Sequence, residues 1–227
     1  MKRLMAVLIS TILIAACQKS SSPEQPESIK PVRDIDGNGY DTIKIGTQIW
    51  LKQNLKTSHY RNGDPIPQVS DFPTWASLTT GAWCWYSNDS ISYNATYGKL
   101  YNWYTVHDPR GIAPLGYHIP TNADWDILEN FLGGLTGGGA LKDTGTAFWL
   151  TPNTGATNSS RFTGLPGGYR DGSNGAFVFM RFLGGWWSST DYDAFNAWYC
   201  NLDHISALVS RYTYVKKDGF SVRCIKD

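Results

Sequence analysis

Apolar and polar residues alternate over residues 42–46, where isoleucines occupy every second position. A period of two is typical of a strand with one buried face. Residues 49–51, Ile-Trp-Leu, follow as an uninterrupted apolar run, which predicts a second, buried strand. The folded part of the chain is therefore expected to begin with strands.

Residues 34–40 precede these strands and allow two interpretations. Asp34 and Asp36 occupy the first and third positions of an EF-hand calcium loop, but the twelfth position, which should be a bidentate glutamate, is Ile45. Gly37-Asn38-Gly39 is also a turn sequence that can join two short strands. The hairpin turn is the interpretation that we prefer.

Helical periodicity appears twice in the middle of the chain. Residues 98–106 predict a helix with Leu100, Trp103 and Tyr104 on one face. Residues 121–132 predict a second helix, because Thr121 and Asp124 form a capping-box-like pair at its start. Its apolar stripe consists of Trp125, Leu128 and Leu132, and Gly133-Gly134 should end it. Residues 73–78 predict one or two helical turns, and residues 82–86 a short aromatic strand.

Periodicity fades between Gly133 and Gly175, where glycine-rich turn sequences recur. A connection of this length is usually functional or folded against itself. Beyond it the chain is strand-rich: residues 176–179 lead to Trp186-Trp187, and residues 196–202, 208–214 and 220–225 predict an antiparallel meander with a last hairpin turn at 216–219. We expect residues 162–200, where glycines flank Trp186-Trp187, to form a core platform under the irregular loop.

The composition agrees with a turn-rich domain that has an aromatic core. The chain of 227 residues contains 10 tryptophans, 13 tyrosines and 23 glycines. Its 20 lysines and arginines balance 19 aspartates and glutamates, so the chain lacks the basic surface that binding to nucleic acid requires.

The N-terminus predicts a lipoprotein signal peptide over residues 1–16. Lys2 and Arg3 precede the apolar run 4–16, which is shorter than the roughly 20 residues that span a bilayer. The run ends in Ile-Ala-Ala-Cys, which resembles a bacterial lipobox and implies cleavage before Cys17 and lipidation of its thiol. Residues 17–33 are polar and proline-containing, so we expect a disordered tether before a domain at 34–227.

Sequence motifs for catalysis are missing. The four histidines, His59, His107, His118 and His204, are not at metal-ligand spacing, and His118 is expected to be structural. Nucleophile-elbow, phosphate-loop and dinucleotide-binding patterns are also missing. The sequence therefore favours a non-catalytic protein.

Several motifs together resemble one known family. They are Ile45–Trp50, Trp85–Asp89, Tyr97–Trp103, Gly116–Thr121, Leu165–Arg170, Trp186–Thr190, Ala197–Tyr199 and Gly219–Cys224. Together they are similar to the Fibrobacter succinogenes major paralogous domain of Bacteroidetes and Fibrobacteres lipoproteins. The resemblance implies an α+β, C-type-lectin-like fold, shared with formylglycine-generating enzymes. Such a fold has two short helices, a small antiparallel sheet and a long irregular Gly/Trp-rich loop region.

The resemblance also bears on the cysteines. Relatives often have Cys-Pro where this chain has Ala113-Pro114, so a cysteine partner is missing. Three mature cysteines besides Cys17 leave one thiol over in an oxidising compartment. Disulfides of lectin-like folds often join the early helical region to the last strand, which favours Cys84–Cys224. The resemblance does not extend to the pair of cysteines that binds copper in formylglycine-generating enzymes.

The resemblance implies a ligand site in the long-loop region. Lectin-like folds bind ligands there, sometimes through calcium held by carboxylate and amide oxygens. The candidates are Tyr169, Asp171, Asn174, Asp191, Tyr192 and Asp193, with the tyrosines placed to stack on a sugar. The simpler interpretation is that the acids only form turns. No metal is assigned, although calcium remains an option.

The sequence thus predicts a lipid-anchored protein of the outer membrane, periplasmic or surface-exposed, that binds a glycan or a protein. Two alternatives remain open. One is a structural or fibre-like surface component, and the other is an extracytoplasmic enzyme of the formylglycine-generating type. A membrane contact through the N-terminal lipid is expected in each case.

Overall fold

The structure is a computed structural model that describes residues 31–227, and within them it is a mixed α+β fold. The predicted signal peptide, Cys17 and the tether up to residue 30 lie outside the described residues. The folded unit begins at Pro31, three residues before the predicted boundary. The reason is that β1 (Val32–Arg33) pairs with β2 (Gly39–Tyr40) and so belongs to the fold.

The turn between β1 and β2 confirms the hairpin interpretation of residues 34–40. The Asp34 carboxylate accepts hydrogen bonds from the Asn38 backbone N–H at 2.9 Å, the Asn38 side-chain amide at 2.8 Å and the Tyr40 hydroxyl at 2.5 Å. Gly37 adopts φ +80°, which an L side chain rarely takes. Asp34, which the sequence offered as a calcium ligand, therefore stabilises the turn in which it lies.

The last strand of the chain shares one sheet with two strands from its early part and one from its middle. Its order is β3 (Thr42–Ile45), β4 (Gln48–Leu51), β13 (Ile225–Lys226) and β7 (Tyr117–His118), and all of its pairs are antiparallel. The two strands predicted over residues 42–51 are confirmed.

The prediction that residues 220–225 continue the meander is wrong. Phe220 forms an antiparallel β-bridge with Tyr101, and Ser221 forms a parallel β-bridge with Trp186. Ile225 pairs with Trp50 and His118. Residues 216–219 therefore turn the chain out of the meander and do not close a hairpin. Each of these partners is distant in sequence, so local periodicity could not identify them.

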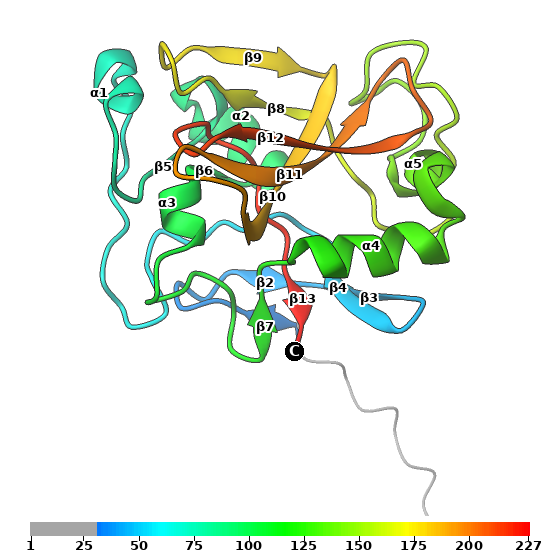
Figure 1. The fold of residues 1–227 in the computed structure, drawn as a ribbon, viewed down its shortest axis with the longest axis horizontal. Coiled ribbons are helices and arrows are strands. Elements are labelled where there is room, and N and C mark those ends of the chain that lie inside the picture. The colour runs from blue at the N-terminus through cyan, green and yellow to red at the C-terminus, as the bar shows by residue number, and fades with distance from the viewer. Residues whose placement is uncertain (1–30) are drawn as a thin grey trace, which may run out of the picture. The chain divides into compact units, whose positions relative to one another are not determined.

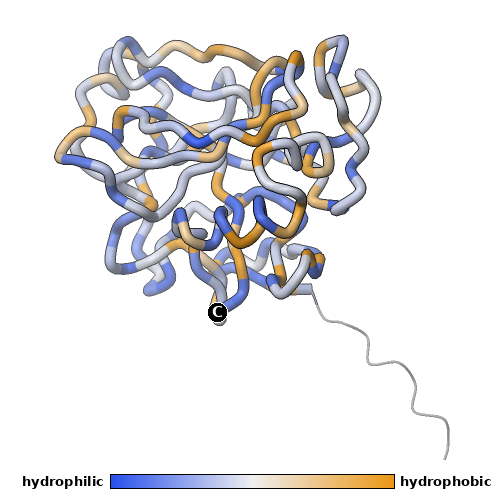
Figure 2. Tube along the Cα trace, turned by 45° about the vertical axis from the view of Figure 1, so that its right-hand side comes forward, coloured by the Kyte–Doolittle hydropathy of each residue, from blue (hydrophilic) through white to orange (hydrophobic). Residues whose placement is uncertain are grey.

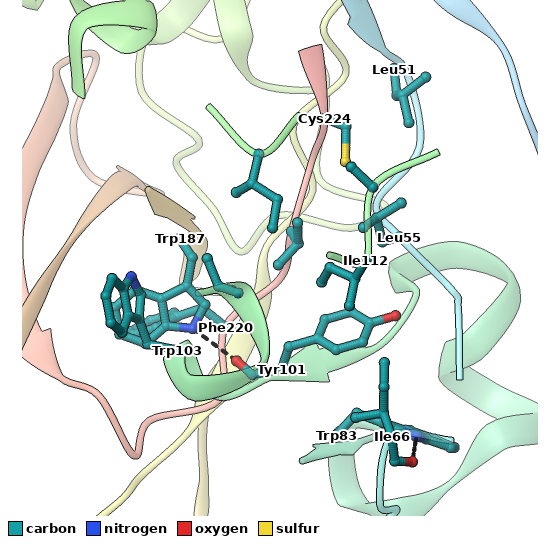
Figure 3. Close-up of a cluster of buried hydrophobic side chains, with 14 of the residues drawn as sticks. Leu51, Leu55, Ile66, Trp83, Tyr101, Trp103, Ile112, Trp187, Phe220 and Cys224 are labelled. Atoms are coloured by element: carbon teal, nitrogen blue, oxygen red, sulfur yellow. Dashed lines mark hydrogen bonds between the residues drawn. The ribbon is translucent and has the colours of Figure 1, made fainter. Parts of the chain in front are cut away.

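The strands predicted over residues 196–202 and 208–214 are confirmed as β11 (Asn196–Asp203) and β12 (Val209–Val215), which form a sheet with β10 (Leu183–Asp191) (Figure 1). Adjacent residues of a strand point to opposite faces, so Trp186 and Trp187 enter different core clusters. Trp186 packs edge-on against Phe162 at 5.6 Å. Trp187 packs against Phe220 at 4.8 Å and donates from Nε1 to the Tyr101 carbonyl (Figure 3). The double tryptophan thereby joins two cores across one sheet, as expected of a core platform.

Five α-helices are present in residues 31–227, where the sequence predicted two helices and, at residues 73–78, one or two helical turns. They are α1 (Phe72–Ala76), α2 (Ser90–Tyr97), α3 (Trp103–Val106), α4 (Asn122–Phe131) and α5 (Gly138–Leu141). The helix α4 confirms the second predicted helix, including the reciprocal capping box of Thr121 and Asp124. The helix α2 was missed because none of its residues is buried, so it carries no apolar stripe.

The first predicted helix is wrong over its N-terminal half. Gly98 has φ +73°, and β6 (Leu100–Tyr101) pairs with β5 (Trp83–Cys84), which confirms the predicted aromatic strand. Only α3 remains helical, capped by the Asn102 side chain, which accepts from the Thr105 N–H. Pairing with the distant β5 overrides the helical periodicity of this stretch.

Residues 133–166, most of the stretch 133–175 that was predicted to be irregular, have little regular structure apart from α5 and a 3₁₀ turn at Gly134–Gly137. They lead into β8 (Gly167–Arg170), which pairs with β9 (Phe177–Met180). Figure 2 shows apolar and polar positions interleaved along this chain. Within residues 31–227, no helix combines the length and the apolarity needed to cross a membrane.

Buried cations hold the irregular segments. Arg170 is fully buried and donates to four backbone carbonyls, those of Val69, Ser70, Asp71 and Gly175. Its guanidinium lies 4.5 Å from the Trp75 ring. The buried Lys142 likewise donates to the carbonyls of Thr154, Asp203 and Ser206. Because carbonyl and π-face contacts replace lost water, these cations tie together loops that have little secondary structure of their own.

Candidate functional site

The residues predicted to bind a ligand lie in two separate turns. Asp171 and Asn174 follow β8, whereas Asp191, Tyr192 and Asp193 join β10 to β11. The Asp171 carboxylate accepts from the Ser173 backbone N–H at 2.7 Å and from its hydroxyl at 2.6 Å. Asn174 Oδ1 accepts from the Ala176 N–H at 2.8 Å. These side chains form ordinary turns, the simpler of the two interpretations.

The second turn uses its acids in the same way. Asp193 Oδ1 accepts from the backbone N–H groups of Phe195 at 2.8 Å and Asn196 at 2.7 Å. The Asn196 side-chain amide, which also donates to this carboxylate, and then the backbone N–H groups lower the pKa of Asp193. Asp191 is paired with Lys216 Nζ at 2.7 Å. In the part of the chain that the structure describes, no group of three or more His, Cys, Asp or Glu side chains could hold a metal ion.

The two candidate tyrosines differ in accessibility. Tyr169 is 7% exposed and stacks on Phe220 at 4.9 Å, so its ring belongs to the core and its prediction as a sugar platform is wrong. Tyr192 is 58% exposed and packs only its edge against Trp198 at 5.4 Å. Of the predicted set, Tyr192 alone presents an aromatic ring to a ligand.

The predicted Cys84–Cys224 disulfide is absent. Cys84, Cys200 and Cys224 are buried free thiols, each in a different core cluster. Burial raises the pKa of Cys84 to about 12 and that of Cys224 still further, so both stay protonated. The prediction failed because Cys84 packs with Trp75 and Leu100, away from the cluster around Cys224.

A pocket of about 500 Å³ lies elsewhere, between the loop at residues 60–67, residues 79–81 and helix α3 with the loop that follows it. Its walls are mainly rings and methyl groups. The lining residues are Tyr60, Pro65, Pro67, Thr79, Thr80, Gly81, Trp103, Tyr104, His107, Asp108, Pro109 and Arg110.

One wall is a guanidinium stacked on a tyrosine. The Arg110 guanidinium lies 3.8 Å from the Tyr60 ring centroid. Asp108 accepts from Arg110 Nε at 2.9 Å and from Nη2 at 2.8 Å, and Asp64 accepts from Nη1 at 3.0 Å. These bonds raise the pKa of Arg110, and Arg110 in turn lowers the pKa of Asp108. The guanidinium plane is thereby held in a fixed orientation.

The other wall is an imidazole stacked on an indole. The His107 ring lies 4.5 Å from Trp103, with an angle of 13° between the planes. Trp103 is anchored by a 2.9 Å bond from Nε1 to the Ser188 carbonyl, and Lys216 Nζ lies 4.5 Å from its ring. The exposed His107 therefore presents a flat, supported face to the pocket.

This arrangement fits a ligand with flat apolar faces and polar edges. Planar groups with supported undersides lose little entropy when a ring stacks on them. The hydroxyls of Thr79 and Thr80 and the carboxylate of Asp108 supply hydrogen-bonding groups at the rim. Sequence reasoning missed the site because its parts come from three separated segments. The available signals were the Pro65-Ile66-Pro67 segment and residues 103–110, where aromatic, histidine and charged residues lie close together.

A buried lysine and a serine form a second polar cluster, outside the pocket. Lys99 Nζ donates to the Ser58 hydroxyl and lies 3.8 Å from the Trp83 ring, and burial lowers its pKa to about 8. However, the Ser58 N–H already bonds Asp36, and the His59 N–H bonds the Thr57 hydroxyl. Neither backbone N–H is therefore free to stabilise an oxyanion beside the Ser58 hydroxyl.

The comparisons with known proteins give one match. Residues 43–226 match the family described as the Fibrobacter succinogenes major domain. Searches of curated proteins and of solved structures returned no match. The family match covers most of the folded unit, including every residue that lines the pocket.

Proposed function

The chain belongs to the Fibrobacter succinogenes major domain family, and we propose that it is a lipid-anchored, non-catalytic binding module of the cell envelope. We infer an anchor on Cys17 and a location at the outer membrane, facing the periplasm or the cell surface. The pocket between the Arg110–Tyr60 and His107–Trp103 stacks carries the proposal.

A glycan is the ligand class that the pocket fits best. Sugar rings have apolar faces that stack on planar groups and hydroxyl edges that need donors and acceptors, and the pocket offers both. A protein ligand, which would insert a ring or a proline, is the second candidate. A C-type-lectin-like relationship is supported by the long irregular region at 133–166 beside the antiparallel sheet β10–β12.

Two observations bear on the alternatives. An enzyme of the formylglycine-generating type would use close, accessible thiols, whereas Cys200 and Cys224 are buried in different clusters. A purely structural component has no need of an open pocket with supported planar walls. Binding is therefore the function that we favour.

The test is a glycan array probed with the full chain, purified in detergent, with calcium and again with a chelator. We expect binding that survives chelation, because the described residues hold no carboxylate cluster. Arg110→Ala should abolish it, whereas Tyr192→Ala, which alters an exposed ring in the predicted loop, should leave it unchanged. Binding that chelation or Tyr192→Ala removes would contradict the proposed site. If no glycan on the array binds and a proline-rich or aromatic peptide is captured, the ligand of the pocket is a protein and not a glycan.

A further inference from the structure

Two loop tips beside the N-terminal end of the fold expose aliphatic side chains. Leu115 is 85% exposed, in the turn before β7, and Ile35 is 52% exposed, in the turn between β1 and β2. Both line a second pocket of about 370 Å³, together with Arg33, Asp34, Arg61, Ile112, Ala113 and Pro114. Two apolar side chains from distant parts of the sequence are thus brought to one patch, here called the Ile35–Leu115 patch.

The two tips are held rigidly. The Asp34 network described above fixes the turn that carries Ile35. The turn that carries Leu115 is closed by the Tyr117 N–H, which donates to the Pro114 carbonyl at 3.0 Å, and Asp227 N donates to the Gly116 carbonyl at 3.0 Å. Little conformational entropy remains to be lost when these side chains leave water.

Two arginines flank the patch. Arg33 Nη1 donates to the Gly37 carbonyl at 2.5 Å, while Arg61 donates from Nε to the Ala113 carbonyl and from Nη2 to the Tyr117 carbonyl. Their other N–H donors have no acceptor among the described residues. Asp34 opposes an anion, but the two arginines leave the charged residues that line the pocket with a net positive charge. Guanidinium donors of this kind match phosphate oxygens.

The position of the patch along the chain indicates its partner. The patch includes β1, which begins one residue after Pro31, and Pro31 is fourteen residues after Cys17. A tether of that length, as the sequence predicts, would span about 20 Å on average. A patch this close to an anchored end meets the membrane surface at an effective concentration on the order of millimolar.

The size of the patch favours a bilayer over a protein. Stable protein interfaces bury about 1,200–2,000 Å², far more than two loop tips around a small pocket supply. A weak contact becomes sufficient when a tether keeps it at the surface. Apolar tips flanked by arginines are suited to the boundary between headgroups and acyl chains.

We propose that the Ile35–Leu115 patch docks on the bilayer, with both aliphatic side chains at the headgroup–acyl boundary and Arg33 and Arg61 on lipid phosphates. This inference rests on the proposed lipid anchor. Docking would fix the orientation of the folded unit and so determine which face the glycan pocket presents.

The test uses the full chain reconstituted into vesicles of phosphatidylethanolamine and phosphatidylglycerol. A fluorophore is attached at Leu115→Cys or Ile35→Cys, since the three native cysteines of the described residues are buried. The matched control is Ile91→Cys on α2, because Ile91 is 94% exposed and does not line the patch. Nitroxide-labelled acyl chains then report how close each fluorophore lies to the bilayer interior.

We expect several-fold stronger quenching at positions 35 and 115 than at position 91, and a decrease at position 115 when Arg33→Gln is added. Equal quenching at positions 91 and 115, on a chain that floats with the vesicles, overturns the docking and leaves the anchor standing. A chain that does not float with the vesicles overturns both the anchor and the docking that depends on it.

Discussion

Two regions with much irregular chain use polar side chains in opposite ways. One consists of the acidic turns at residues 171–174 and 191–193, and the other is the Tyr60–Arg110 pocket. In the turns, the acids face backbone N–H groups of the same turn or a neighbouring lysine. In the pocket, Asp64 and Asp108 hold a guanidinium flat on Tyr60 and leave its outer face open. In the turns, the hydrogen bonds stabilise the loop itself. In the pocket, they hold a planar surface on which another molecule can stack.

The difference shows why residue type is a poor guide to a ligand site in this fold. Aspartate and asparagine are common in turns because their oxygens can accept local N–H donors. Once these oxygens are used, a cation would have to displace existing hydrogen bonds. A planar cation on a buried ring has no such competitor above it, so its exposed face is free for stacking.

The largest expected effect comes from removing the cation that holds the first turn. Arg170→Met keeps an unbranched apolar stem but leaves four carbonyls without their donor. We expect a loss on the order of 3–5 kcal/mol in the free energy of unfolding, measured by urea denaturation. The control Arg181→Met removes one exposed bond, to the Thr146 carbonyl, and should cost about 0.5 kcal/mol. Equal losses in the two variants would contradict a clamping role.

The second effect concerns Asp218, which packs under the same turn. Burial, together with the nearby Asp171, raises the pKa of Asp218 to about 7, although the Gly172 N–H donates to one of its oxygens. Its other oxygen has no hydrogen-bond partner. Because the pKa is higher in the folded state, the contribution of Asp218 to stability is complete below about pH 4 and is lost as the pH rises to about 7.

Asp218→Asn should remove this loss. We expect the wild type to become less stable between pH 5 and pH 8 relative to the variant, by on the order of 2–4 kcal/mol. Urea denaturation of both proteins at the two pH values measures the difference. Parallel pH profiles would show that Asp218 titrates normally.

The third effect tests the pocket. His107→Ala removes an exposed ring that stacks on Trp103, so we expect glycan affinity to fall about tenfold, equivalent to about 1.4 kcal/mol. The free energy of unfolding should change by about 0.5 kcal/mol or less, because the ring is exposed. Calorimetric titration and urea denaturation separate the two quantities. A variant that keeps full affinity would remove His107 from the site.

The smallest effect is expected in the second turn. Asp193→Ala removes the acceptor of two backbone N–H groups and should cost about 1 kcal/mol or less, since water can replace the carboxylate. Calcium should shift the melting temperature of neither the wild type nor the variant. A calcium-dependent rise that Asp193→Ala abolishes would restore the metal interpretation of this turn.

Local signals predicted the parts of the fold that depend on local interactions. The capping box at Thr121, the alternation at residues 42–46 and the turn at Gly37 were correct, because each is satisfied within a few residues. Residues 98–101 and 220–225 were mispredicted, since their partners are distant: Leu100 pairs with Cys84, and Ile225 pairs with Trp50 and His118.

The pocket could not be predicted for the same reason. Arg110 reaches Asp64 across 46 residues of sequence, and Trp103 is fixed by a bond to Ser188. Nothing in the spacing of these residues indicates that they meet. The sequence did identify the acids of the long-loop region, and local hydrogen bonding then explains why they form turns.

The most direct test of the account is a crystallographic fragment screen of residues 31–227, soaked with monosaccharides and aromatic fragments in the presence of calcium. We predict that fragments stack between Arg110 and His107 and that no calcium binds at Asp171 or Asp193. Calcium or fragments at the two acidic turns, with the Tyr60–Arg110 pocket empty, would contradict the central claim that the supported planar pocket is the binding site.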